Sequence, residues 1–296
     1  MQTHTRRSRV ARLWAALAAL VVVVPATLAV STGSAVAAGS NTLTVKAGEY
    51  TYQLKGSPKA GWVQIDFDNP GVEDHMMIVA RLKKGTTNAQ FKKALASPDG
   101  SGLDKISASD PNVSGTPGVI GPGEKTTVMT ELTAGTYGLA CFIPAPDGSP
   151  HTAHGMFKVF TVSGKSNLKP PTDGVAEVSI TDTAITVPDG DAPKSLTLKV
   201  SNEGTTPHGF QLVQLAAGKT IDDANTYFNE FFNTGTAPAG GAPGVLVGGV
   251  EGIAPGGMAY LEWTLPAGNY GYLSTGGDDP PNDDFTKGLK GEFTIS

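Results

Sequence analysis

Cysteine is almost absent from this chain of 296 residues, which contains a single one, Cys141. A lone thiol excludes an internal disulfide, so Cys141 is expected to be either a buried apolar residue or a ligand. Charge is also sparse: the formal net charge is −5, and lysine and arginine are scattered after the N-terminal segment, which argues against nucleic-acid binding. No apolar tail closes the chain, and we expect no membrane anchor in the mature protein.

The N-terminal segment has the pattern of an export signal. Four arginines precede an apolar run over residues 13–30, which is broken by Pro25, and small residues then end in Ala35-Val36-Ala37. A basic start, an apolar middle and a small-residue cleavage site predict a signal peptide over residues 1–37, in preference to a transmembrane anchor. We therefore expect a secreted or periplasmic protein, and the paired arginines leave open whether export uses the general or the twin-arginine route.

Two parts of the chain repeat one another at a constant offset. The matching residues, 133 positions apart in each case (208 minus 75, for example), are His75 and His208, Pro122 and Pro255, and Phe160 and Phe293. One offset kept across separated segments indicates a tandem duplication. A polar stretch with two prolines divides the copies, which predicts a first domain over residues 38–163, a linker over 164–172 and a second domain over 173–296. Each domain is expected to fold on its own.

Each copy has the sequence pattern of short β-strands. Residues 62–67 and 195–200 alternate apolar and polar side chains, as strands with one buried face do. The 38 glycines and 21 prolines supply frequent turns. Residues 88–95 and 221–232 predict one helix in each copy. The predicted fold class is all-β: two tandem Greek-key β-sandwiches, each with one short helix inserted.

One loop of the first copy carries a concentrated set of soft donors. Cys141 ends a predicted strand, His151 lies in the proline- and glycine-rich loop that follows, and Met156 opens the next strand. A further imidazole, His75, follows the turn Asn69-Pro70-Gly71. Each of these side chains could simply be buried in a core, but thiolate, imidazole and thioether together form the ligand set that copper favours. The combination therefore indicates a copper site.

This order of residues resembles the cupredoxins, whose plastocyanin, azurin and copper nitrite reductase members place a first histidine after an Asn/Gly turn. Their cysteine, second histidine and methionine lie on one late loop. The resemblance implies a cupredoxin-like fold for both copies and one copper ion in the first domain. His75, Cys141 and His151 would be the equatorial ligands, and Met156 the weak axial ligand. His154 is the rival to His151, although its closeness to Met156 makes convergence on one ion awkward.

The second copy provides an internal control for this site. The residues at the four corresponding positions are His208, Ser274, Asp284 and Leu289. Without a thiolate or a thioether, this position is not expected to hold blue copper. The second domain is therefore predicted to be structural or to provide a surface for a partner.

The function predicted from the sequence is single-electron transfer by an exported cupredoxin-like protein, with a redox partner protein that the sequence does not identify. The alternative is a non-redox β-sandwich that recognises a partner or the cell surface, or sequesters copper. Enzymes are disfavoured, because multicopper oxidases need a His-Cys-His run and nitrite reductases a histidine beside the cysteine, whereas Ala140 and Phe142 flank Cys141. The oligomeric state is left open.

Overall fold

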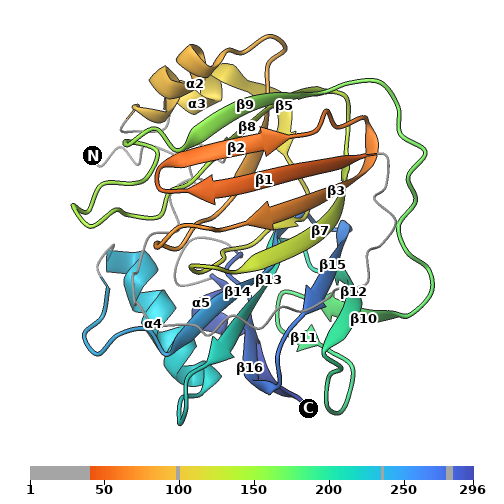
Figure 1. Ribbon diagram of the computed structural model, residues 1–296, viewed down its shortest axis with the longest axis vertical. Helices are drawn as coiled ribbons and strands as arrows, with labels where there is room; N and C mark the ends of the chain where they lie inside the picture. Colours follow the sequence, from red (N-terminus) through yellow and green to blue (C-terminus); the bar gives the residue numbers. More distant parts are fainter. Residues whose placement is uncertain (1–40, 98–100, 235–236, 278–282) are drawn as a thin grey trace, which may run out of the picture.

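A computed structural model describes residues 41–97, 101–234, 237–277 and 283–296, and the predicted signal peptide, residues 1–37, lies outside them. Strands dominate the described part of the chain (Figure 1). The alternation that predicted them appears in their burial: in β3 (Gly61–Asp68), Val63, Ile65 and Phe67 are buried and the residues between them half-buried. Because successive side chains of a strand point to opposite faces, each sheet can offer one apolar face to a core.

The first half is a sandwich of two sheets. Its strands are β1 (Thr42–Gly48), β2 (Thr51–Lys55), β3, β4 (Ile78–Leu82), β5 (Ser107–Asn112), β6 (Thr116–Pro117), β7 (Lys125–Leu132), β8 (Gly135–Ala140) and β9 (Phe157–Val162). One sheet has the order β2-β1-β3-β7 and the other β5-β4-β8-β9. Val45 and Val63 of the first sheet share a buried cluster with Val79 and Leu139 of the second. This apolar layer between the sheets is what holds the sandwich together.

The second half repeats this architecture. Its strands are β10 (Val175–Ile180), β11 (Ile185–Thr186), β12 (Ser195–Asn202), β13 (His208–Leu215), β14 (Gly244–Ile253), β15 (Met258–Thr264), β16 (Gly268–Leu273) and β17 (Lys290–Ile295). The parallel pairing of β10 with β12 repeats that of β1 with β3. Tyr137 donates its hydroxyl to the carbonyl of Thr133 at 2.8 Å, and Tyr270 donates to that of Pro266 at 2.9 Å. The prediction of two tandem β-sandwiches is confirmed.

The helices lie partly where the sequence predicts them. α2 (Asn88–Leu95) has the expected bounds and begins at a capping box formed by Thr87 and Gln90. α4 (Ile221–Thr234) extends two residues beyond its expected end. The prediction of one helix per half is incomplete, because α3 (Ser101–Ile106) and α5 (Asp284–Lys287) are also present, each too short to show a helical apolar period. In the described residues, none of the helices has the length and apolar character needed to cross a bilayer.

The two halves share their sheets. β7 of the first half pairs with β15 of the second, which joins four strands from each half into one eight-stranded sheet. β6 of the first half pairs with β14 as the edge of a five-stranded sheet. In these ladders Val128 faces Leu261, and Pro117 faces Val250. In both pairs each residue faces its own copy in the repeat, which is the arrangement of a two-fold symmetric, isologous interface.

The core also crosses from one half to the other. The buried cluster around Cys141 includes Val213, Tyr227 and Leu246 of the second half. No strand or helix occupies residues 163–174, which connect β9 to β10. The domain boundaries stay a prediction, but the shared sheet does not favour halves that fold alone, because separating them would expose two strand edges and apolar surface.

Candidate metal centre

His75 is held by a ladder that begins at the turn before it. Asn69 accepts a hydrogen bond from the amide of Gly71 at 2.9 Å and donates its own side-chain amide to the carbonyls of Glu73 and Ile120, at 2.8 and 3.0 Å. His75 and Ile120 then exchange two backbone hydrogen bonds of 3.0 Å. This ladder fixes the backbone from which the imidazole of His75 projects into the interior, where it is fully buried.

The loop between β8 and β9 folds back on itself and returns to Cys141. The amide of Cys141 donates to the carbonyl of Met156 at 3.1 Å, and the amide of Met156 donates to that of His151 at 2.9 Å. His151 in turn donates its amide to Ile143 at 2.8 Å. These backbone hydrogen bonds place His151 and Met156 beside the end of β8, although the loop that connects β8 to β9 is long.

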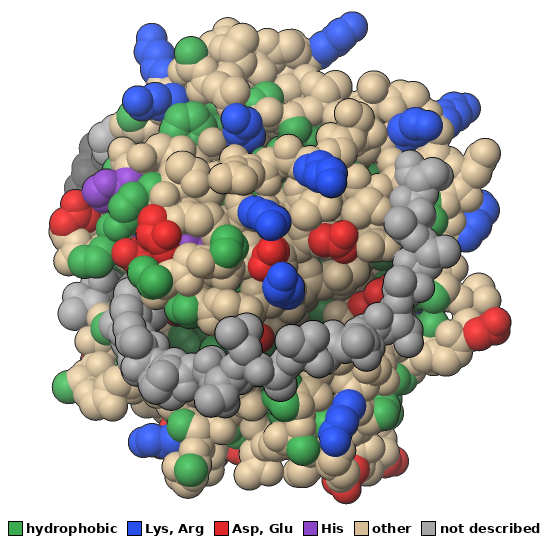
Figure 2. All heavy atoms as spheres, viewed as in Figure 1, with side chains coloured by type: hydrophobic (Ala, Val, Ile, Leu, Met, Phe, Trp, Pro, Cys, Tyr) green, Lys and Arg blue, Asp and Glu red, His purple; other side chains and the backbone are tan. Residues whose placement is uncertain are grey.

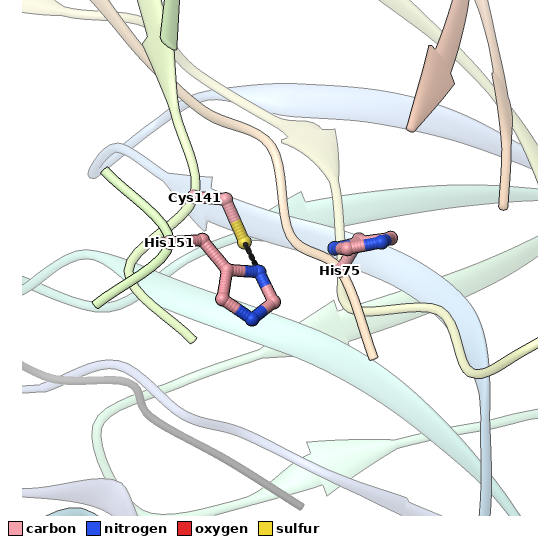
Figure 3. Close-up of side chains that lie close together, drawn as sticks. All are labelled: His75, Cys141 and His151. Carbon is pink, nitrogen blue, oxygen red and sulfur yellow. Dashed lines mark hydrogen bonds between the residues drawn. The ribbon is translucent and has the colours of Figure 1, made fainter. Parts of the chain in front are cut away.

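Three potential ligands converge from these two segments. The ligand atoms of His75, Cys141 and His151 all lie within 4.8 Å of one another, and all three residues are buried. Figure 3 shows the Cys141 and His151 side chains in contact and His75 facing them from a separate segment. The Sγ atom of Cys141 lies 3.4 Å from Nδ1 of His151. One thiol and two imidazoles therefore enclose one point in the core.

The electrostatics of this cluster favour neutral imidazoles. Burial lowers the pKa of His75 to about 3, helped by the nearby His151, and neither of its ring nitrogens has a hydrogen-bond partner. Burial also lowers the pKa of His151, against the opposing effect of Glu73, and raises that of the Cys141 thiol to about 12. A buried imidazole with no partner is costly unless it binds something. The unpartnered nitrogens of His75 therefore fit a metal ligand better than a core residue.

Glu73 is a functional candidate that the sequence did not reveal. Its carboxylate accepts a hydrogen bond from Nε2 of His151 at 2.7 Å and one from the hydroxyl of Tyr50 at 3.1 Å. The side chain of Glu73 is only 9% exposed. With the proton on Nε2, the lone pair of His151 lies on Nδ1, the atom that faces Cys141. The only sequence signal is a carboxylate two positions before His75.

The remaining two predicted residues differ in their placement. Met156 is fully buried in the same cluster as Cys141, and its role as axial ligand stays a prediction. His154 lies outside the group of three and is about a third exposed. Its Nε2 lies 2.8 Å from the hydroxyl of Ser149, and its ring stacks on Tyr50 with 4.5 Å between ring centroids. Histidine atoms reach the surface beside acidic and hydrophobic side chains in Figure 2, over this end of the sandwich. The geometry therefore favours His151 over His154.

The corresponding place in the second half holds a different network. Nδ1 of His208 donates to Asp284 at 2.7 Å, and its Nε2 donates to Asp182 at 3.0 Å. Ser274, at the position of Cys141, donates its hydroxyl to Asp284. Burial alone would lower the pKa of His208, but Asp284 and Asp182 outweigh it and raise the value. A carboxylate therefore lies against each ring nitrogen of His208, which favours its protonated form at the place of the first-half cluster.

The donor set of the first half fits one copper ion. A thiolate and two imidazoles form the equatorial set of blue-copper sites, and a methionine supplies their weak axial contact. All four side chains, two imidazoles, one thiol and one thioether, lie on the two segments that converge here. The sulfur donor and the tight burial make the same cluster a poor match for magnesium or calcium, which prefer several oxygen ligands.

Comparisons with known proteins give similarities among solved structures alone, because no family model and no curated protein matches the chain. A reduced auracyanin from Roseiflexus castenholzii is 22% identical over 43% of this chain and 99% of its own, with a TM-score of 0.28. A multicopper oxidase is 14% identical over 86% of this chain and 88% of its own, with a TM-score of 0.23. The Cu-containing nitrite reductase of Thermus scotoductus SA-01 is 14% identical over 86% of this chain and 61% of its own, with a TM-score of 0.24.

The architecture of the chain is defined by its own strands. Two four-stranded layers face each other in each half, with the same parallel strand pair and the same buried tyrosine bond. Each half of the chain is thus a β-sandwich of two four-stranded layers, and its resemblance to the cupredoxins is one of ligand types.

Proposed function

We propose that this chain is an exported electron-transfer protein with one type 1 copper ion in its first half. The observation that carries the proposal is the buried convergence of His75, Cys141 and His151 within 4.8 Å. A bound copper ion would supply a one-electron couple between its cupric and cuprous states. Met156 is proposed as the weak axial ligand.

The chain's own residues would give such a centre two properties. The backbone amide and carbonyl of both His75 and Cys141 are hydrogen-bonded, so the donor positions depend little on whether a metal is bound. Full burial of the three ligands keeps water out of the cluster. A rigid, dry site suits electron transfer, because little has to rearrange when the charge changes. Cys141 would provide a covalent path from the centre into β8.

We propose an electron carrier rather than an oxidase or reductase because the histidines outside the cluster are already engaged by other residues. Four histidines follow the predicted signal peptide. His208 is engaged by two carboxylates, and His154 is hydrogen-bonded at the surface. Two imidazoles therefore remain for metal binding, which is the number that one type 1 site uses. The redox partner is proposed to be a protein of the same extracytoplasmic compartment.

The experiment is a copper and electron count on the mature full-length protein. We expect one copper per chain after loading with Cu(II) and removal of excess metal. Titration with a reductant should then consume one electron per chain, reversibly. Copper bound without a reversible one-electron step would contradict electron transfer and favour sequestration, and a chain that retains no copper would overturn the proposal as a whole.

A further inference from the structure

The carboxylate of Glu73 is placed as a support for His151 rather than for the fold in general. Nε2 of His151 donates to it at 2.7 Å while Nδ1 faces Cys141 at 3.4 Å. The imidazole is fully buried, so its outer nitrogen depends on this carboxylate for a hydrogen-bond partner. Ligand histidines commonly donate their second N–H to a carboxylate, which fixes the tautomer and the ring orientation and raises the basicity of the ligating nitrogen.

Tyr50 holds the Glu73 carboxylate in place and has an unfavourable backbone conformation. Tyr50 donates its hydroxyl to Glu73 at 3.1 Å, and its ring meets the edge of the His151 ring at 5.0 Å between centroids. Among the described residues, Tyr50 is the only non-glycine with a positive φ, at 60°. Such a conformation is unusual for a bulky side chain and persists only where its surroundings demand it. Here it places the phenol against both Glu73 and His151.

Comparison of the two halves distinguishes a role of Glu73 at the candidate metal centre from a general role in folding. The copy of Glu73 in the second half is Thr206 and that of Tyr50 is Thr183, in the half where Asp284 replaces His151. Glu49, by contrast, accepts a hydrogen bond from the amide of Val72, and its copy Asp182 accepts the equivalent bond from Thr205. The carboxylate that braces the turn is thus kept in both halves, although Asp182 also contacts His208. The carboxylate at position 73 occurs only in the half that has an imidazole at the position of His151.

We propose that Glu73 is a positioning residue for the metal centre, which holds His151 in the Nε2–H tautomer and so directs Nδ1 at the ion. The inference rests on the proposed function, in that His151 is taken as a ligand. Tyr50 supports it by keeping the carboxylate on the ring nitrogen. The His151 ring is fully buried, and Tyr50 packs edge-on against it while stacking on His154.

The test compares three full-length variants. Glu73→Ala removes the acceptor, and Glu73→Gln keeps its size and an acceptor oxygen without the charge. Asp147→Asn is the matched control, because Asp147 pairs with the ring nitrogen of His154, at 3.3 Å on the same loop. The tautomer of His151 is read by nitrogen NMR in the copper-free protein, and Cu(II) affinity is measured by competition with a chelator.

We expect wild type to hold the Nε2–H tautomer and Glu73→Ala to lose it, with a fall in Cu(II) affinity of about tenfold to a hundredfold. Glu73→Gln should keep the tautomer with a smaller fall, and Asp147→Asn should match wild type in both. An unchanged tautomer in Glu73→Ala would overturn the inference, as would an equal loss of affinity in Asp147→Asn. If wild type fails to bind copper, the proposed function is wrong, while the copper-free tautomer still decides the role of Glu73.

Discussion

Nδ1 of His208 lies 2.7 Å from Asp284, and these two residues are the repeat copies of His75 and His151, whose ring centroids lie 5.1 Å apart. In the first half burial lowers the pKa of both imidazoles, which favours the neutral forms that can share a cation. In the second half a carboxylate stands in place of one imidazole, and it raises the pKa of the other together with Asp182. The second half therefore favours binding of a proton at the place where the first half offers ligands to a metal.

This arrangement predicts that stability depends on pH through His208. Its pKa is raised in the folded state, so its contribution is complete below the unfolded value of about 6.5 and is lost as pH rises through the folded value. We expect the free energy of unfolding of the copper-free protein to fall as pH rises above 6.5. Chemical denaturation across pH 5–9 measures it.

Two variants isolate the His208 contribution. Glu251, whose Oε1 is buried without a partner, also has a raised pKa, of about 8 because of burial, so it lowers stability with rising pH between about 4.5 and 8. The variant Glu251→Gln should remove the fall in stability that Glu251 causes. The fall above pH 6.5 that is due to His208 should remain. Adding His208→Gln should remove most of the remaining decline up to about pH 8, above which ionisation of the Cys141 thiol in the unfolded state still lowers stability. The prediction is wrong if the decline above pH 6.5 is as steep in the double variant as in Glu251→Gln.

The choice between two loop histidines gives the second prediction. His151→Ala should reduce Cu(II) binding and its visible band strongly, because it deletes one of the three converging ligands. His154→Ala should leave both within error, because His154 lies outside the cluster and is hydrogen-bonded to Ser149. Absorption spectra of both copper-loaded variants decide it, and the opposite ranking would show that His154 is the ligand.

Met156 gives a prediction about redox potential. Met156→Leu preserves the apolar volume of a fully buried side chain and removes the thioether. We expect the coloured copper form to persist with a changed potential, because the axial bond of such sites is long and weak and tunes the potential. Voltammetry of wild type and variant measures the change, and identical potentials would remove Met156 from the ligand set.

The shared sheet predicts that the halves unfold together. Leu261 of β15 is buried opposite Val128 of β7, so Leu261→Ala should lower the free energy of unfolding by about 2–5 kcal/mol. Met258, on the same strand and 39% exposed, is the matched control, and Met258→Ala should change stability by less than about 0.5 kcal/mol. Calorimetry should show one transition. Two separate transitions, with one unaffected by Leu261→Ala, would indicate independent domains.

Sequence patterns predicted local features well. The alternation in residues 62–67 marks β3, and the helix expected over residues 88–95 has the bounds of α2, because both patterns lie within the segment that they predict. The convergence of His75 on the Cys141 loop followed from chain order and from the resemblance to cupredoxins, since no local pattern places residues so far apart in contact.

The features that the sequence did not reveal depend on long-range pairing. Glu73 and His151 are 78 positions apart, and a lone glutamate near a histidine carries no signature of its own. The pairing of β7 with β15 likewise joins strands of two repeats with no turn between them. Both features depend on how the two sheets and the two halves pack, which the pattern within one strand or loop does not specify.

The most direct test of the central claim is the visible absorption spectrum of the mature protein loaded with Cu(II). A thiolate bound to Cu(II) with two imidazoles in a trigonal site gives an intense visible charge-transfer band. We predict a blue or green protein, and a Cys141→Ser variant that is folded and colourless. A wild-type protein that binds copper and is folded, yet has no such band, would contradict the type 1 assignment.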